Sequence, residues 1–528
     1  MGQKGSQRNH LQIPRTSPLL FFDRQLREMI LPLFFEQLLL MLVGIADTFV
    51  VSYCKEAAVS GVSLVNSFNT IFLFLFTALS SGGAVIVSQY LGRKENTTAS
   101  QAASQLFSLS LLFSLAVAVV TVVGNEEILG FLFGRVEPEV MEAGITYLRI
   151  SAYSYPLLAV YNAGAALYRS IGKTSTTMYI SVLANFINVA GNCIGVFLLH
   201  AGVAGVAWPS FLSRGFSALL ITGLCFRKSL PIRYRWQWIF TWNSKLQKKI
   251  LGIALPNGIE SGIFQFVKVA LSSVAALFGT SQIAANGIAQ SIWSLAALMC
   301  TAMGPVFITV IGRCMGAGEI KQAEYYFKKL LKLTLGLAFV WNVLVFAVTP
   351  LILKGYAVSE ETKSLVLLLV LIHNLFNAVA FPLADPLGKG LRAAGDVGFT
   401  TGVSIFTTVG IRLVFSWLFA LVLRGGVIGI AWAMCLDWII RGIILLFRLR
   451  QGKWKSFQII RCFGEKLFIK ICKGEHYGIQ KTWFVRPAGF PYLYGLHGFR
   501  ESSHRPAQLD PGRRKFPANY PPGPGIWH

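Results

Sequence analysis

Three of the carboxylates inside the long apolar segments of this sequence are the residues most able to do chemistry. Asp47 lies near one end of the first apolar segment, Glu36 lies earlier in it, and Asp385 lies in a later segment. If these segments cross a membrane, each carboxylate costs roughly 2.5 to 3.5 kcal/mol near the bilayer centre and marks a candidate functional site. Such a group can take up a proton or hold a monovalent cation. We therefore expect reversible cation binding, first at Asp47 and second at Asp385.

A row of amide side chains is expected beside Asp47. Asn185, Asn188 and Asn192 are spaced by three and four residues, which places them on one face of a helix. Their segment runs in the same direction as the first, so Asn192 comes near the depth of Asp47. We interpret Asp47, Asn188 and Asn192 as a pocket for a proton or Na⁺. The alternatives are a carboxylate in interfacial water and a packing cluster worth about 0.6 kcal/mol per contact.

Two glutamates, a tyrosine and a histidine are candidates for contact with a bound solute. Glu36 and Glu260 each follow a proline by one helical turn, and they face a cleft if the first and seventh segments line it. The same pattern also starts helices, where the acid complements the helix dipole. Tyr161 can stack on an aromatic cation. His373 is either a packing histidine or a proton relay.

Long apolar segments must position all of these residues. Hydrophobic residues make up 54% of the 528 residues and charged residues 13%, a balance that one soluble core does not need. A membrane-spanning helix needs about 20 mainly apolar residues. Windows of this kind lie at about 29–52, 62–90, 103–124, 143–167, 177–199, 202–226, 250–277, 284–312, 329–353, 363–391, 398–423 and 426–449. The expected fold class is all-α integral membrane, with about twelve transmembrane helices in two six-helix lobes around a central cleft.

The second half of the chain repeats the first at an offset of 224 residues. The segment GVAGVAW at 202–208 recurs as GVIGIAW at 426–432, with five of seven positions identical. Because each copy holds an even number of spans, both enter the membrane from the same side and are related by an axis along the membrane normal. Two such lobes commonly rock about a shared site to give alternating access.

Positive charge alternates between the connections and predicts the orientation. The net charge is +25, but Lys and Arg concentrate in even-numbered connections, as in cytoplasmic loops, so we expect no nucleic-acid partner. Both termini are then cytoplasmic. The expected organisation is a cytoplasmic N-terminal segment 1–28, an N-lobe 29–226, a basic cytoplasmic linker 227–249, a C-lobe 250–450 and a basic, disordered tail 451–528.

The sequence contains no recognisable enzyme or ATP-binding motif. Eight cysteines occur without metal-site spacing, and nucleophile elbows and phosphate-binding loops are missing. Asp437 and Arg441 are four residues apart and indicate a structural ion pair. We expect no enzyme activity, no cofactor and no bound metal other than a coupling ion, so that the energy comes from an H⁺ or Na⁺ gradient.

Several short motifs, in order, resemble those of the MATE family of multidrug and toxic-compound extrusion transporters. They are GIADT at 44–48, SQYLG at 88–92, GAGE at 316–319 and LRAAGD at 391–396. The resemblance covers about 25–450 and implies cation-coupled export of amphipathic, often cationic compounds. Asp47, in the first motif, resembles the family's proton or sodium site.

The chain departs from the family pattern at three positions. Asn192 stands where many relatives carry an aspartate, and Asp385 lies about one turn later than the aspartate of relatives in the tenth helix. Gln265 lies near the place of a glutamate that some relatives carry in the seventh helix, and we include it among the substrate-cleft candidates. These departures leave the coupling ion and its stoichiometry open.

The function expected is a secondary active antiporter of the inner (plasma) membrane, monomeric, with small amphipathic solutes and the lipid bilayer as its partners. One alternative is a lipid-linked precursor flippase of the same superfamily. Such relatives typically have fourteen spans and an arginine-lined cleft, for which Arg214 and Arg412 are the candidates here. The other alternative is a membrane scaffold or enzyme that transports nothing.

Overall fold

Helices make up nearly all of the chain that a computed structural model describes, namely residues 18–51, 53–54, 56–134, 136–356, 358–457 and 459. The chain divides into two units, 1–462 and 463–528, and the second lies outside the described residues. The expected disordered tail therefore lies outside them from residue 460 onward. Before that point, α19 ends at Gln451 and a short 3₁₀ turn, η5 (Lys453–Ser456), follows.

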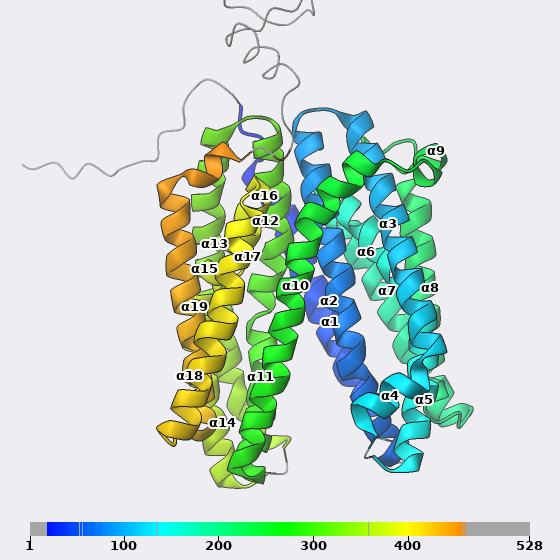
Figure 1. Ribbon diagram of the computed structural model, residues 1–528, viewed down its shortest axis with the longest axis vertical. Helices are drawn as coiled ribbons and strands as arrows, with labels where there is room; N and C mark the ends of the chain where they lie inside the picture. Colours follow the sequence, from blue (N-terminus) through cyan, green and yellow to red (C-terminus); the bar gives the residue numbers. More distant parts are fainter. Residues whose placement is uncertain are drawn as a thin grey trace, which may run out of the picture. The chain divides into compact units, whose positions relative to one another are not determined.

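The helices of the first half form the N-lobe and those of the second half the C-lobe (Figure 1). The N-lobe consists of α1 (Asp23–Val51), α2 (Glu56–Gly92), α3 (Asn96–Val123), α4 (Asn125–Phe133), α5 (Pro138–Tyr153), α6 (Tyr155–Ile171), α7 (Thr174–Cys193), η1 (Ile194–Leu198) and α8 (Ala204–Cys225). The linker contains α9 (Trp236–Phe240). The C-lobe consists of α10 (Ser244–Ala275), η2 (Ala276–Phe278), α11 (Thr280–Ala296), α12 (Leu298–Gly316), α13 (Ile320–Lys354), α14 (Glu360–Val379), α15 (Phe381–Ala384), α16 (Pro386–Ala394), α17 (Val397–Phe406), η3 (Thr407–Leu413), α18 (Val414–Trp417), η4 (Leu418–Val422) and α19.

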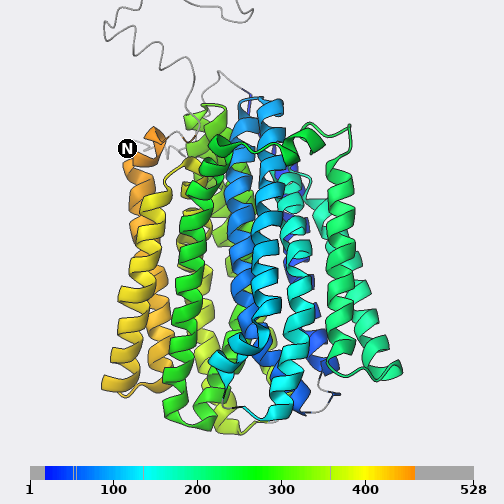
Figure 2. The same ribbon diagram turned by 45° about the vertical axis from the view of Figure 1, so that its right-hand side comes forward.

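Twelve spans account for these helices. Ten helical segments in the described part of the chain are long and apolar enough to cross a membrane. The α5 and α6 pair and α8 occupy the two remaining expected windows, since they cover the fourth and the sixth. The fold is therefore all-α with about twelve transmembrane helices, and the long helices run alongside one another in both views (Figures 1 and 2).

Three spans are interrupted within the apolar windows. The fourth breaks at Ser154, directly before the Pro156 turn of α6. The tenth breaks at Ala380 and again at Asp385, each followed within two residues by a proline. Proline has no amide hydrogen and its ring clashes with the preceding turn, which breaks a helix at that point. The eighth span breaks at Ala297 without a proline nearby.

Wide π-helical turns occur late in the fifth and eleventh spans. The turn η1 and the turn η4 begin at Ile194 and Leu418, which are separated by the repeat offset. A third turn, η3, lies earlier in the eleventh span and carries Arg412. The matching stretch of the fifth span is ordinary α-helix. Turns of this type often occur at functional sites.

The two lobes contact each other closely at the end of the bundle that carries α9, which we call the linker end (Figure 1). A Cβ atom on Gly316 would lie 1.9 Å from the Gln89 carbonyl oxygen, and one on Gly92 would lie 2.1 Å from that of Arg313. These four residues form two repeat-related pairs, so α2 and α12 cross symmetrically. Only glycine allows backbones to approach this closely.

Further contacts hold the linker end together. The Gln89 side chain donates a buried hydrogen bond to the Ala393 carbonyl at 2.8 Å, and Arg313 donates to the Ser170 carbonyl. The largest buried apolar cluster includes residues of both lobes, such as Ile86 and Phe307. The lobes are therefore closed to one another at this end.

At the opposite half of the bundle, which we call the far half, a cavity separates the lobes. Its volume is about 750 Å³. It is lined by Met41, Ile45 and Phe49 of α1 and by Ser291, Ile292 and Leu295 of α11, among others. The buried apolar clusters of this region each stay within one lobe. The arrangement is thus closed at the linker end and hollow between the lobes towards the far end.

Candidate cation site

The structure brings Asp47 into contact with the amide row of the fifth span. The Asn192 side-chain amide on α7 donates to the Asp47 carboxylate at 2.6 Å and also lies 3.2 Å from the Asn188 amide oxygen. Asn188 in turn donates to the Ser210 hydroxyl of α8 at 2.9 Å. Asn192 is fully buried, whereas Asp47 is partly exposed. One carboxylate and two amides therefore form a connected polar site that reaches the surface at Asp47.

A guanidinium and a tyrosine complete the surroundings of this carboxylate. Arg214 of α8 interacts electrostatically with Asp47 and donates to the Ser154 hydroxyl at 2.6 Å. Ser154 is the residue at which the fourth span breaks, so the break places its side chain inside the lobe. Tyr147, which also interacts with Asp47, donates to the Asn66 amide oxygen at 3.3 Å.

The Asp47 site can bind a cation in two ways. The carboxylate can accept a proton, which removes its charge. Alternatively, the carboxylate and the Asn192 amide oxygen can hold a hard cation, because such ions take oxygen ligands. That amide oxygen is buried and has no hydrogen-bond partner, an unusual state for a buried polar atom.

Glu36 lies in a second polar cluster of the N-lobe. Its side chain is 1% exposed and accepts hydrogen bonds from Arg169 at 2.6 Å and from Thr177 at 2.8 Å. Nearby, the Tyr161 hydroxyl lies 2.9 Å from the Ser181 hydroxyl. Glu36 is thus enclosed within the N-lobe, where it ties α1 to α6 and α7.

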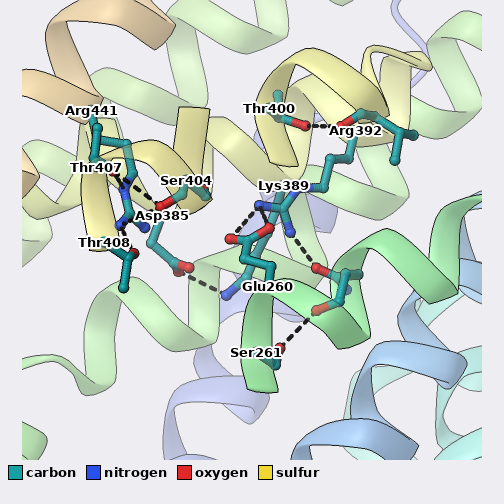
Figure 3. A network of polar contacts seen from close by, with 12 residues as sticks. Glu260, Ser261, Asp385, Lys389, Arg392, Thr400, Ser404, Thr407, Thr408 and Arg441 are labelled. Atoms are coloured by element: carbon teal, nitrogen blue, oxygen red, sulfur yellow. Dashed lines mark hydrogen bonds and ion pairs between the residues drawn. The ribbon is translucent and has the colours of Figure 1, made fainter. Parts of the chain in front are cut away.

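The C-lobe contains a similar pair, in which Glu260 matches Glu36 at the repeat offset and the arginine lies one residue earlier than that offset gives. Glu260 of α10 contacts Arg392 of α16 at 2.7 Å, and Arg392 also donates to Asn257. Asp385, at the second break of the tenth span, pairs with Lys389 at 2.7 Å. Figure 3 shows both acids facing their cationic partners. Asp385 lies in the other lobe from Asp47, so the structure does not join the two expected coupling carboxylates.

A buried charge network lies deeper in the C-lobe. The Asp437 carboxylate, 0% exposed, is held by Arg412 at 2.6 Å and by Arg441 at 2.8 Å. Arg441 also donates to the hydroxyls of Thr407 at 3.0 Å and Thr408 at 2.7 Å (Figure 3). The expected pair of Asp437 and Arg441 therefore includes a second arginine.

The two remaining substrate-cleft candidates differ in exposure. His373 of α14 is 1% exposed, and neither ring nitrogen has a hydrogen-bond partner. Its ring centroid lies 6.5 Å from that of Trp438. Gln265 lies on α10 and is partly exposed.

Sequence reasoning missed several partners of these sites. Lys389 follows Asp385 by four residues, a spacing that by itself suggests an ion pair on a helix. Ser154 and Ser210 gave no comparable signal, because short hydroxyl side chains are frequent throughout the apolar segments. Ser210 joins the Asp47 site through the packing of α8 against α7, and Ser154 joins it through the packing of α8 against α5 and α6.

Comparisons with known proteins agree with the duplicated architecture. The MatE family model matches residues 32–194 and 256–418, and both limits differ by the repeat offset. "Uncharacterized transporter YisQ" of Bacillus subtilis is 25% identical over 435 residues, covering 80% of this chain and 93% of that protein. "Probable multidrug resistance protein NorM" of Thermotoga maritima is 23% identical over 447 residues, covering 83% and 94%.

Solved structures share the fold. A multidrug resistance MATE family transporter of the MOP superfamily in the outward-facing conformation superposes with a TM-score of 0.72 at 20% identity, covering 81% of this chain and 96% of that one. A MATE structure in the straight conformation gives a TM-score of 0.75 at 18% identity, covering 81% and 95%.

The chain is a multi-pass membrane protein with two duplicated lobes, and relatives named as a transporter and as a multidrug resistance protein match it over most of its length. Two matched repeats cover more than half of the sequence. The chain belongs to the MatE family.

Proposed function

We propose that this protein is a secondary active antiporter that exports small amphipathic, often cationic compounds. An H⁺ or Na⁺ gradient drives export through alternating access of the two lobes, and the protein acts as a monomer in the plasma membrane. The names of its relatives, several of them multidrug resistance proteins, support the class of solute. The absence of a phosphate-binding sequence motif supports a gradient as the energy source.

The observation that carries the proposal is the contact between Asp47 and Asn192. The Asn192 amide at 2.6 Å and the nearby Arg214 guanidinium stabilise the charged carboxylate. A bound proton or Na⁺ cancels that charge, and the packing of α1 against α7 and α8 then has a different free energy. A bound cation shifts the equilibrium between the two lobe arrangements only if its affinity differs between them. The contacts of Asp47 must therefore differ in the arrangement that is open at the linker end.

The proposed orientation places the linker end in the cytoplasm. The linker is basic, as expected of a cytoplasmic connection, and the lobes are closed to each other at this end through Gln89 and Gly316. The cavity of about 750 Å³ lies in the far half, beside the turn of α1 that carries Asp47. This arrangement supports a state from which solute leaves towards the outside.

We propose that five residues contact the solute, and they fall into two groups by their exposure. Glu260, Gln265 and Tyr161 are partly exposed, which supports direct contact with a solute. Glu36 and His373 are each 1% exposed, so they meet a solute only if the helices around them move.

Transport of a fluorescent cationic dye in proteoliposomes tests the proposal. Proton and sodium gradients are imposed separately on the wild type, on Asp47→Asn and on the control Asp23→Asn, whose carboxylate pairs with Lys329 at the exposed start of the same helix. We expect one gradient to drive dye transport in the wild type and the control, and Asp47→Asn to lose at least about tenfold of the rate. Equal rates in Asp47→Asn and the wild type would rule out Asp47 as the coupling residue.

A further inference from the structure

The C-lobe contains a pocket at the place that corresponds to the Asp47 site of the N-lobe. At the repeat offset, Asp47 corresponds to Leu271 and Asn188 corresponds to Arg412. Both C-lobe residues line one small pocket between α10, α11, η3 and α19, with a volume of about 40 Å³. The C-lobe thus has a pocket where the N-lobe has the Asp47 site, and the carboxylate of the N-lobe site is replaced there by the alkyl side chain of Leu271.

The polar lining of this pocket consists of hydrogen-bond donors and amides and includes no carboxylate. It comprises Lys268, Ser272, Asn286, Gln290, Trp293 and Arg412. Asp437 pairs with the pocket residue Arg412 and is shared with Arg441. One carboxylate between two guanidinium groups leaves a net positive charge. Lys268 adds another, because it forms no ion pair within the described residues.

Two buried donors at the pocket have no acceptor. The Arg412 side chain is 5% exposed, and its Nε atom is buried without a hydrogen-bond partner. The indole Nε1 of Trp293 is likewise buried and unpartnered. Buried donors are normally satisfied because an unmade hydrogen bond is costly. A guest that accepts hydrogen bonds would satisfy both.

The apolar walls favour a guest that also has an aromatic or alkyl part. The Arg412 guanidinium carbon lies 4.9 Å from the ring centroid of Phe264, and Trp293 stacks on Trp438 with a centroid distance of 5.8 Å. A volume of about 40 Å³ admits a small anionic group and not a whole drug-sized molecule, which needs at least about 300 Å³.

We propose that this C-lobe pocket binds an anionic group, such as a carboxylate, between Arg412, Lys268 and Trp293. The group is either a free inorganic anion or the acidic part of an amphipathic solute. The N-lobe site, with Asp47, takes the cation, so the two repeat-related sites have opposite polarity. The acidic part of an amphipathic solute as the bound group rests on the proposed export function, because that solute would be transported. Binding of a free inorganic anion does not depend on transport.

Calorimetric titration of the purified full-length protein in detergent tests the pocket without any gradient. Benzoate is the probe, benzamide is its neutral match, and bromide is the competing inorganic anion. We expect benzoate to bind saturably with one site per chain, and benzamide to bind at least tenfold more weakly. Bromide that displaces benzoate identifies a general anion site, whereas no displacement identifies a site for organic carboxylates, and either result supports the proposal.

Two variants and a matched control make the test specific. Lys268→Gln should weaken benzoate binding by about tenfold, since it removes a charge at the pocket while the buried network stays intact. Lys354→Gln, an exposed lysine at the end of α13, should bind as the wild type does. Arg412→Gln should abolish binding and is interpreted only if its thermal unfolding resembles that of the wild type.

Equal affinity for benzoate and benzamide, or equal affinity in Lys268→Gln and Lys354→Gln, would overturn the anion site. A result against the anion site can be told apart from a result against the proposed export function. Benzoate binding with no gradient-driven dye transport would contradict export alone, and dye transport with no benzoate binding would contradict the pocket alone.

Discussion

Charged residues inside the lobes differ in whether an opposite charge pairs with them and in how deeply they are buried. Asp437 is completely buried between Arg412 and Arg441, and Glu36 is buried against Arg169. Asp47 is partly exposed, and its hydrogen-bond donor is a neutral amide. This difference is why we assign coupling to Asp47 and a structural role to Asp437.

Removal of the Asp437 charge should destabilise the protein strongly. Asp437→Asn leaves Arg412 and Arg441 side by side in a buried environment without a counter-charge. Loss of one partner of a buried ion pair costs about 3 to 5 kcal/mol, so we expect a clear fall in the midpoint of thermal unfolding in detergent. Glu360→Gln, which breaks an exposed pair with Lys363, should change it little. Similar midpoints for the two variants would contradict a structural role for the network.

The site residues were predictable from sequence to the extent that helical spacing fixes them. The three- and four-residue spacing of Asn188 and Asn192 predicted one face, and the structure places Asn192 against Asp47. The exposure of Glu36 was not predictable, because its burial depends on Arg169 and Thr177 from other helices. What Asp47 and Asp385 do in the protein remains a prediction.

At the scale of helices, the crossing of α2 and α12 holds the linker end closed. Gly92 and Gly316 lie at repeat-related positions, and each faces a backbone carbonyl of the other helix. Sequence alone predicted where these helices run but not that they cross there. Likewise, the apolar windows could not reveal the breaks at Ser154 and Ala297, because hydropathy is unchanged across them.

An added methyl group at the crossing should force the lobes apart. In Gly316→Ala the new Cβ atom would lie 1.9 Å from the Gln89 oxygen, and overpacking of this kind costs about 1 to 3 kcal/mol. The closed arrangement should lose population, and the buried thiol of Cys314 should react faster with a water-soluble maleimide. The measurement uses a background in which the other cysteines are serine.

Gly336→Ala is the control for this substitution, because no atom lies within 4 Å of a Cβ placed there. It should leave labelling of Cys314 unchanged. If Cys314 reacts with the maleimide no faster in Gly316→Ala than in this control, the crossing of α2 and α12 does not govern closure of the linker end.

At the scale of the whole molecule, alternating access requires the lobes to separate at the linker end during each transport cycle. The repeat and the number of spans were predictable from the sequence, because repeated motifs and apolar windows are visible in it. The two family matches have the same 224-residue offset. Which end is closed was not predictable, since it depends on contacts between the lobes such as that of Gln89 with Ala393.

A disulfide across the linker end should stop transport reversibly. A Cβ atom on Gly312 would lie 3.0 Å from the Ser88 Cβ, slightly closer than the roughly 3.5 to 4.5 Å of disulfides, so a small adjustment allows a bond. The double variant Ser88→Cys with Gly312→Cys should transport dye only after reduction. Each single variant should transport under both conditions. Full transport by the oxidised, fully cross-linked protein would contradict alternating access by lobe separation.

Coupling at Asp47 is tested by measuring whether movement of the solute drives movement of the coupling ion. Proteoliposomes are loaded with dye, with equal proton and sodium concentrations on both sides, and ion entry is recorded as the dye leaves down its gradient. We predict that the wild type takes up protons or sodium in step with dye exit, and that Asp47→Asn takes up neither. Dye exit without ion uptake in the wild type, or equal uptake in Asp47→Asn, would contradict an antiporter coupled at this carboxylate.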